Sequence, residues 1–229
     1  MTTISENLQA VRTRIEAAAL TRGRRPGDIA LLAVSKTWPA TAVREAAAAG
    51  QTAFGENYVQ EGLAKIAELR SLGLQWHFIG PLQSNKTRDV AEAFDWVHAV
   101  DRLKIAERLS AQRPEERPPL QICLQVNISG EDSKSGLSPD AVATLAHEVA
   151  LLPRLQLRGL MAIPEPVADF EQQRQAFRAL RELQENLIKD GLPLDTLSMG
   201  MSDDLEAAIA EGATIVRVGS AIFGERGKA

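Results

Sequence analysis

One lysine stands directly after a strongly apolar run and could act as an amine nucleophile. Lys36 follows the run at 29–34, with only Ser35 between them. An amine at the end of a buried strand is partly removed from water, and desolvation lowers a lysine pKa until the neutral form becomes accessible. That form can condense with a carbonyl compound to give a Schiff base. The competing interpretation is a lysine whose long side chain simply reaches solvent.

Small and hydroxyl-bearing residues near the end of the chain could bind an anion. Gly219 and Ser220 follow the apolar run at 214–218, and Ser202 follows a weaker run at 196–199. A glycine permits close backbone approach, and a serine offers both an N–H group and a hydroxyl. Ser202 could also cap a helix that begins at Asp203, and the two roles are compatible.

An arginine interrupts the last apolar run. Alternation along a strand points Arg217 away from its valine neighbours and therefore toward the opposite face. If that face is interior, Arg217 is a buried cation that needs a partner. The acceptor nitrogen of a pyridine ring would serve, and an arginine there would keep the nitrogen unprotonated. An ion pair with Glu56 or Asp101 is the alternative.

These residues follow short apolar runs that alternate with helical patterns along the chain. The predicted strands are 29–34, 52–54, 76–79, 96–100, 120–128, 155–163, 196–199 and 214–218. Helices are expected before and between them, among them 3–21, 139–151, 170–188 and 203–210. Eight such units in 229 residues favour closure into a barrel over an open doubly wound sheet. We therefore predict an α/β fold, a single (β/α)8 TIM barrel over residues 1–229, with an amphipathic helical segment at 1–25 packed on it.

Such a barrel would place the chemistry-bearing residues together. Active sites of this fold lie at the carboxyl ends of the strands, and loops after strands seven and eight commonly bind phosphate. A phosphate cradle facing a rim lysine is what a pyridoxal phosphate site requires. Many sugar-phosphate aldolases require the same arrangement, so this spacing is not specific.

Composition excludes several classes of protein. The chain has 45% hydrophobic residues and a formal net charge of -4, which argues against a nucleic-acid or membrane-surface partner. The single cysteine, Cys123, lies in an apolar run and reads as a buried thiol, and the three histidines are not at ligand spacing, so no metal site is expected. No leader or membrane-spanning stretch is evident, and a cytoplasmic protein is expected.

Longer motifs resemble a known family, the pyridoxal phosphate homeostasis proteins, which share a barrel with the N-terminal domain of alanine racemases. The matching stretches cover nearly the whole chain: AVSKT at 33–37, FGENYVQE at 54–61, WHFIGPLQSNK at 76–86, QVNIS at 125–129, KSG at 134–136, RGLMAIP at 158–164, SMGMSDD at 198–204 and VRVGSAIFG at 216–224.

The resemblance implies a role for each candidate site residue. It implies that Lys36 carries pyridoxal phosphate as an internal aldimine. The implied phosphate ligands are Ser202, Gly219 and Ser220. Arg217 would face the pyridine nitrogen and Asn57 would lie near the ring, although Asn57 could instead cap the following helix.

The resemblance leaves a carrier and an enzyme as alternatives. Racemisation needs an acid–base group on each face of the substrate carbon, and Lys36 supplies one. In the racemases the other is a tyrosine from a second domain, which this sequence is expected to lack. The single tyrosine, Tyr58, is expected in the first turn of a helix. We therefore favour a non-enzymatic monomer that holds the cofactor and transfers it to apo-enzymes, over an amino-acid racemase.

Several further residues have open roles. Lys86 and Lys134 lie in predicted mouth loops and could attract phosphate or accept the cofactor, although solvated loop lysines are the simpler interpretation. His77 and His98 lie in predicted strands, where buried, hydrogen-bonded imidazoles are expected.

Overall fold

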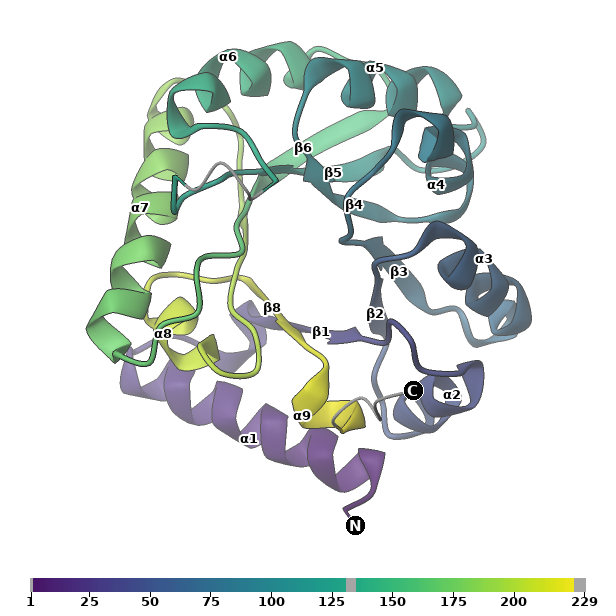
Figure 1. The fold of residues 1–229 in the computed structure, drawn as a ribbon, viewed down its shortest axis with the longest axis vertical. Helices are drawn as coiled ribbons and strands as arrows, with labels where there is room; N and C mark the ends of the chain where they lie inside the picture. The colour runs from purple at the N-terminus through teal and green to yellow at the C-terminus, as the bar shows by residue number, and fades with distance from the viewer. Residues whose placement is uncertain (1, 131–134, 225–229) are drawn as a thin grey trace.

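Eight parallel strands close into a barrel in sequence order (Figure 1). The computed structural model describes residues 2–130 and 135–224. The strands are β1 (Ala30–Val34), β2 (Ala53–Glu56), β3 (Gln75–Phe78), β4 (Trp96–Val100), β5 (Leu120–Gln125), β6 (Leu155–Met161), β7 (Thr196–Ser198) and β8 (Ile215–Val218). Each strand pairs with the next, and β8 pairs with β1. The predicted (β/α)8 barrel is confirmed.

Helices surround the barrel on its outer face (Figure 1). They are α1 (Ile4–Thr21), α2 (Ala40–Ala48), α3 (Val59–Glu68), α4 (Thr87–Ala93), α5 (Leu103–Gln112), α6 (Pro139–Ala150), α7 (Phe170–Lys189), α8 (Leu205–Ala210) and α9 (Ser220–Phe223). Short 3-10 turns lie at η1 (Pro26–Asp28), η2 (Arg70–Leu72) and η3 (Ser84–Lys86). No helix in the described ranges is both long and apolar enough to cross a bilayer.

Two apolar cores result from the alternation of side chains along the strands. The larger core fills the space between the barrel and its helices. The smaller core fills the barrel interior, and its buried members are Leu32, Val34, Ile79, Trp96, Ala99, Cys123, Met161 and Ile215. A strand that is buried on both faces consists of a continuous apolar run, and most of the strands could therefore be predicted from the sequence.

The extra helix α1 packs against α8 and α9. Its N-terminus is fixed by a capping box between Thr3 and Glu6, and an apolar stripe that includes Leu8 and Ile15 is buried. Figure 1 shows α1 alongside α8 and α9, and both contacts are present in the structure. This position lets α1 support the loops that follow β7 and β8.

Two predicted boundaries are wrong in ways that matter for the site. The second strand, predicted at 52–54, extends through Glu56, which is fully buried. The helix predicted from Asp203 begins at Leu205, after the N-cap residue Asp204. Ser202 is therefore not the cap of α8.

Candidate functional site

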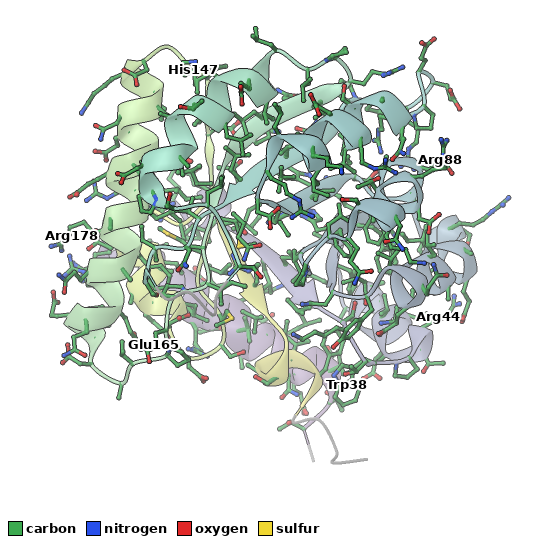
Figure 2. The ribbon with its side chains drawn as sticks, turned by 45° about the horizontal axis from the view of Figure 1, so that its top comes forward. Trp38, Arg44, Arg88, His147, Glu165 and Arg178 are labelled. Atoms are coloured by element: carbon green, nitrogen blue, oxygen red, sulfur yellow. The ribbon has the colours of Figure 1, made fainter. Side chains whose placement is uncertain are left out.

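A pocket of about 220 Å³ opens at the carboxyl ends of the strands. It is lined by residues that lie at the ends of different strands or follow them: Val34, Lys36, Trp38, Asn57, Ile79, Ile163, Met201, Ser202, Asp203, Arg217, Gly219, Ser220 and Gly224. All six candidate residues from the sequence are among them. Trp38, labelled in Figure 2, stacks on Phe223 of α9 with ring centroids 5.9 Å apart, which joins the first loop to the last.

The half-buried Lys36 lies in a turn held by buried charges. The ammonium Nζ of Lys65 donates to the Ser35 carbonyl oxygen at 2.6 Å, to Glu56 Oε1 at 2.7 Å and to Glu61 Oε1 at 2.6 Å. Glu61 Oε1 also accepts from the Thr37 amide at 2.5 Å. The residues on both sides of Lys36 are thus tied to one ion cluster.

Glu56 is the most buried member of this cluster. Ser35 Oγ donates to its Oε1 at 2.6 Å, and burial raises the pKa of its carboxyl group despite the neighbouring Lys65. Its other oxygen, Oε2, has no hydrogen-bond partner within the described part of the chain. We call Ser35, Thr37, Glu56, Glu61 and Lys65 the lysine side of the pocket.

The wall formed after β7 and β8 carries two hydroxyl groups, those of Ser202 and Ser220. Ser220 Oγ donates to Ser202 Oγ at 3.1 Å, which joins the loops after β7 and β8. A Cβ atom added at Gly219 would lie 3.2 Å from the Val34 carbonyl oxygen, so a glycine fits best where β8 ends against β1.

Helix α1 holds the loop after β7, and helix α9 after β8, through their carbonyl groups. Arg14 Nη2 donates to the Ser202 oxygen at 2.9 Å, and its guanidinium pairs with Glu206 at 2.8 Å. Asn7 Nδ2 donates to the Ile222 oxygen at 2.9 Å. We call Ser202, Ser220 and these α1 supports the serine side of the pocket.

Arg217 points into the barrel interior and forms part of the pocket floor. Its Nη1 donates to Ser198 Oγ at 2.8 Å and its Nη2 donates to the Ala162 oxygen at 2.9 Å. Burial lowers its pKa to about 10. The alternative ion pairs are not formed, because Glu56 pairs with Lys65 and Asp101 pairs with Arg102.

Asn57 lines the same pocket, and its alternative role is excluded. The N-cap residue of α3 is Tyr58, with no side-chain cap bond, so Asn57 does not cap that helix. Its Oδ1 is buried and has no hydrogen-bond partner among the described residues. A Cβ atom at Gly80 would meet the Asn57 backbone oxygen at 2.2 Å, so close packing fixes this segment.

Other candidates lie away from the pocket. Tyr58 is 56% exposed and lies just before α3, not in its first turn as predicted. Lys86 ends η3 and does not line the pocket, and Lys134 lies outside the described residues. Burial raises the pKa of the Cys123 thiol to about 12, which leaves it inert. The described ranges contain no cluster of acids, histidines and cysteine that could hold a metal ion.

Several residues that shape the site were not singled out from the sequence. Lys65, Glu61 and Arg14 lie in helices, where charged residues normally face solvent. The motif FGENYVQE contains both Glu56 and Glu61, and it was the feature of the sequence that could have pointed to them. His77 and His98 were correctly predicted to be buried and hydrogen-bonded.

Comparison with known proteins agrees with this architecture. Residues 4–227 match the family described as alanine racemase, N-terminal domain. A pyridoxal phosphate homeostasis protein of Pseudomonas aeruginosa is 64% identical over 226 residues, covering 99% of this chain and 97% of its own. PipY of Synechococcus elongatus, whose structure was solved with PLP bound, is 40% identical with a TM-score of 0.84, covering 97% of this chain and 100% of its own.

An alanine racemase of Clostridium difficile shares the fold alone. It is 15% identical with a TM-score of 0.73, and the match covers 96% of this chain but 57% of the racemase. The full-length relatives and the shared barrel lead to one conclusion: this chain belongs to the pyridoxal phosphate homeostasis protein family, built on the alanine racemase N-terminal domain.

Proposed function

We propose that this protein binds pyridoxal phosphate at the described pocket and serves its homeostasis, with Lys36 as the Schiff-base lysine. The observation that carries the proposal is the convergence, in one pocket, of an amine, a buried guanidinium and two hydroxyl groups. The bound cofactor in the related PipY structure supports the same identity.

The donor set suits each part of this ligand. Ser202 and Ser220 offer hydroxyl donors for a phosphate, and Gly219 leaves the backbone open to close approach. Arg217 offers N–H groups at the floor for the ring nitrogen. The Oδ1 atom of Asn57, which is buried and has no hydrogen-bond partner among the described residues, supplies a polar group for the ring substituents. The cofactor provides an aldehyde, and the ring conjugated to it stabilises the covalent adduct.

The residues of the chain supply binding and orientation. Lys36 would hold the cofactor by condensing its amine with the aldehyde carbon, with the loss of one water molecule as the C=N bond forms. Arg217 keeps the ring nitrogen unprotonated, because a guanidinium donates hydrogen bonds and accepts none. An unprotonated ring withdraws electrons weakly, which favours storage of the cofactor over carbanion chemistry.

We further propose that the protein acts as a carrier rather than an enzyme. Racemisation requires a second acid–base group on the far face of the substrate. The exposed Tyr58 does not line the pocket, and the lining carboxylate Asp203 lies beside Ser202 on the serine side. We propose a single-domain monomer that transfers the cofactor to apo-enzymes. Size-exclusion chromatography tests the monomer.

Absorbance spectroscopy tests the binding proposal. The purified protein, loaded with pyridoxal phosphate, is expected to be yellow, and Lys36→Ala is expected to lose the Schiff-base absorbance. A wild-type protein that stays colourless with added cofactor contradicts the proposal.

A chirality assay separates the carrier from the enzyme. The loaded protein is incubated with single enantiomers of amino acids, and the enantiomeric ratio is followed over time. The ratio is expected to stay constant, and sustained racemisation would establish the enzyme instead.

A further inference from the structure

A chain of hydrogen bonds crosses the barrel interior from the base of β3 to the pocket floor. His77 Nε2 lies 3.0 Å from Gln75 Oε1, and His77 Nδ1 lies 2.9 Å from His98 Nε2. His98 Nδ1 lies 2.8 Å from Ser198 Oγ, which is 2.8 Å from Arg217 Nη1. Gln75, the first residue of β3, is exposed, whereas the other members are buried.

The connectivity fixes the direction of every bond in this chain. Gln75 Oε1 is an amide oxygen that only accepts, so His77 donates to it from Nε2. The neutral His77 ring then has a bare Nδ1, which accepts from His98 Nε2. The neutral His98 ring in turn has a bare Nδ1, so the Ser198 hydroxyl donates to it while the Ser198 oxygen accepts from Arg217 Nη1.

The surroundings favour the neutral form of both rings. Burial lowers the pKa of His77 to about 3, and burial, together with His77 and Arg217, places that of His98 well below its usual range. His77 also stacks on Trp96, with ring centroids 5.2 Å apart and nearly parallel planes. An added proton would place two hydrogens in one of these short contacts.

We propose that Gln75, His77, His98 and Ser198 form a one-directional relay that positions the Arg217 guanidinium at the pocket floor. This inference rests on the proposed function, in which the relay holds Arg217 in the orientation that meets the ring nitrogen. These are positioning residues, because they act through Arg217. Because both imidazoles are neutral, the relay itself contains no acid stronger than the Arg217 guanidinium.

Nitrogen-15 NMR of the imidazoles in the apo-protein tests the relay directly at neutral pH. The chain has three histidines, and His147 lies on the outer helix α6, well away from the barrel interior (Figure 2). A His147→Gln background therefore leaves the two relay rings alone in the spectrum. Both are expected to be protonated at Nε2 and bare at Nδ1. An Nδ1-protonated ring at either position would overturn the relay.

Variants of the exposed Gln75 test whether the chain transmits a change. Gln75→Met removes the acceptor at the far end, and is expected to shift the ring signals of His77 and, to a lesser degree, those of His98. Gln75→Glu restores an acceptor and is expected to keep both tautomers. A change confined to His77, or an effect equal in the two variants, would overturn the proposed coupling.

Cofactor titration then separates the relay from the proposed function. Ser198→Ala breaks the link to Arg217, and is expected to weaken pyridoxal phosphate binding about fivefold, because the guanidinium loses one of its two positioning hydrogen bonds. Unchanged affinity in a folded Ser198→Ala protein would overturn the positioning role. The expected tautomers in a wild-type protein that binds no cofactor would support the relay and refute the proposed function.

Discussion

The two sides of the pocket are held by different kinds of interaction. The lysine side is organised by an ion cluster in which Lys65 is 5% exposed and Glu56 is fully buried. The serine side is organised by α1, whose Arg14 and its partner Glu206 keep 38% and 41% of their side chains exposed. The proposed attachment residue Lys36 is thus supported by interior charges, whereas the proposed phosphate-binding segments are held by surface contacts to carbonyl oxygens.

This difference has a thermodynamic consequence. A buried charge that loses its partner remains desolvated, which is far more costly than losing a partly exposed ion pair. Changes on the lysine side should therefore affect the stability of the whole protein. Changes on the serine side should mainly affect ligand affinity.

Removing the central charge of the lysine side should give the largest effect. Lys65→Met leaves Glu56 buried without its partner, and is expected to lower the free energy of unfolding by about 3–5 kcal/mol. Urea denaturation of the apo-protein measures this change. The exposed Lys104 provides the matched control, because Lys104→Met should change stability by less than about 0.5 kcal/mol.

A double variant checks the cause of that loss. Adding Glu56→Gln to Lys65→Met removes the unpaired charge, and is expected to recover part of the lost stability. If the double variant loses more stability than the two single variants lose together, the ion-cluster account is contradicted.

Acid should destabilise the protein through the two buried histidines beneath the pocket floor. Unfolded histidines bind protons below a pKa of about 6.5, whereas His77 stays neutral until about pH 3 and His98 also resists protonation. Below about pH 6.5 the unfolded state therefore binds more protons than the folded state. The free energy of unfolding then decreases as the pH falls, by up to about 2.7 kcal/mol per pH unit for the two rings. His77→Gln should roughly halve this histidine contribution in denaturation curves between pH 6 and pH 4.5. An unchanged slope would refute it.

On the serine side, loss of the contact from α1 should weaken the affinity for a ligand that carries a phosphate. Arg14→Gln frees the Ser202 carbonyl and the loop that carries it, and is expected to weaken pyridoxal phosphate binding about fivefold. Pyridoxal, which has no phosphate, serves as the comparison ligand and should be affected less than about twofold. Arg22→Gln, at the exposed C-cap of α1, is the control variant. Equal weakening of both ligands would show a general structural effect.

A smaller effect is expected from strain beside Lys36. Thr37 has a φ of 68°, a left-handed conformation that is unfavourable for a β-branched residue. Thr37→Gly relieves that strain but adds freedom to the unfolded chain, so stability should rise by about 0.5 kcal/mol. A loss of more than about 1 kcal/mol in thermal or urea unfolding would show that the threonine side chain contributes packing instead.

The barrel and the pocket residues were predictable because their signals are local. Apolar runs mark strands buried on both faces, and polar residues that follow parallel strands must gather at one edge. This reasoning identified Lys36 and Ser220 from sequence. It also predicted the direction of Arg217, which alternation along a strand determines.

The supporting contacts were not predictable because they join distant parts of the chain. His98 and Ser198 are 100 residues apart, and Arg14 and Ser202 are 188 residues apart. The burial of Lys65 depends on Glu56 and Ser35, whose positions are set only when the barrel closes. A lysine in a helix gives no sequence signal of such burial.

Chemical trapping tests the central claim most directly. The loaded protein is reduced with borohydride, digested and analysed by peptide mass spectrometry, so that a Schiff base becomes a stable amine at its lysine. The reduced cofactor is expected on the peptide that contains Lys36, and to be lost in Lys36→Ala. Label on Lys65 or Lys86 with Lys36 unmodified, or no label at all, would contradict the account.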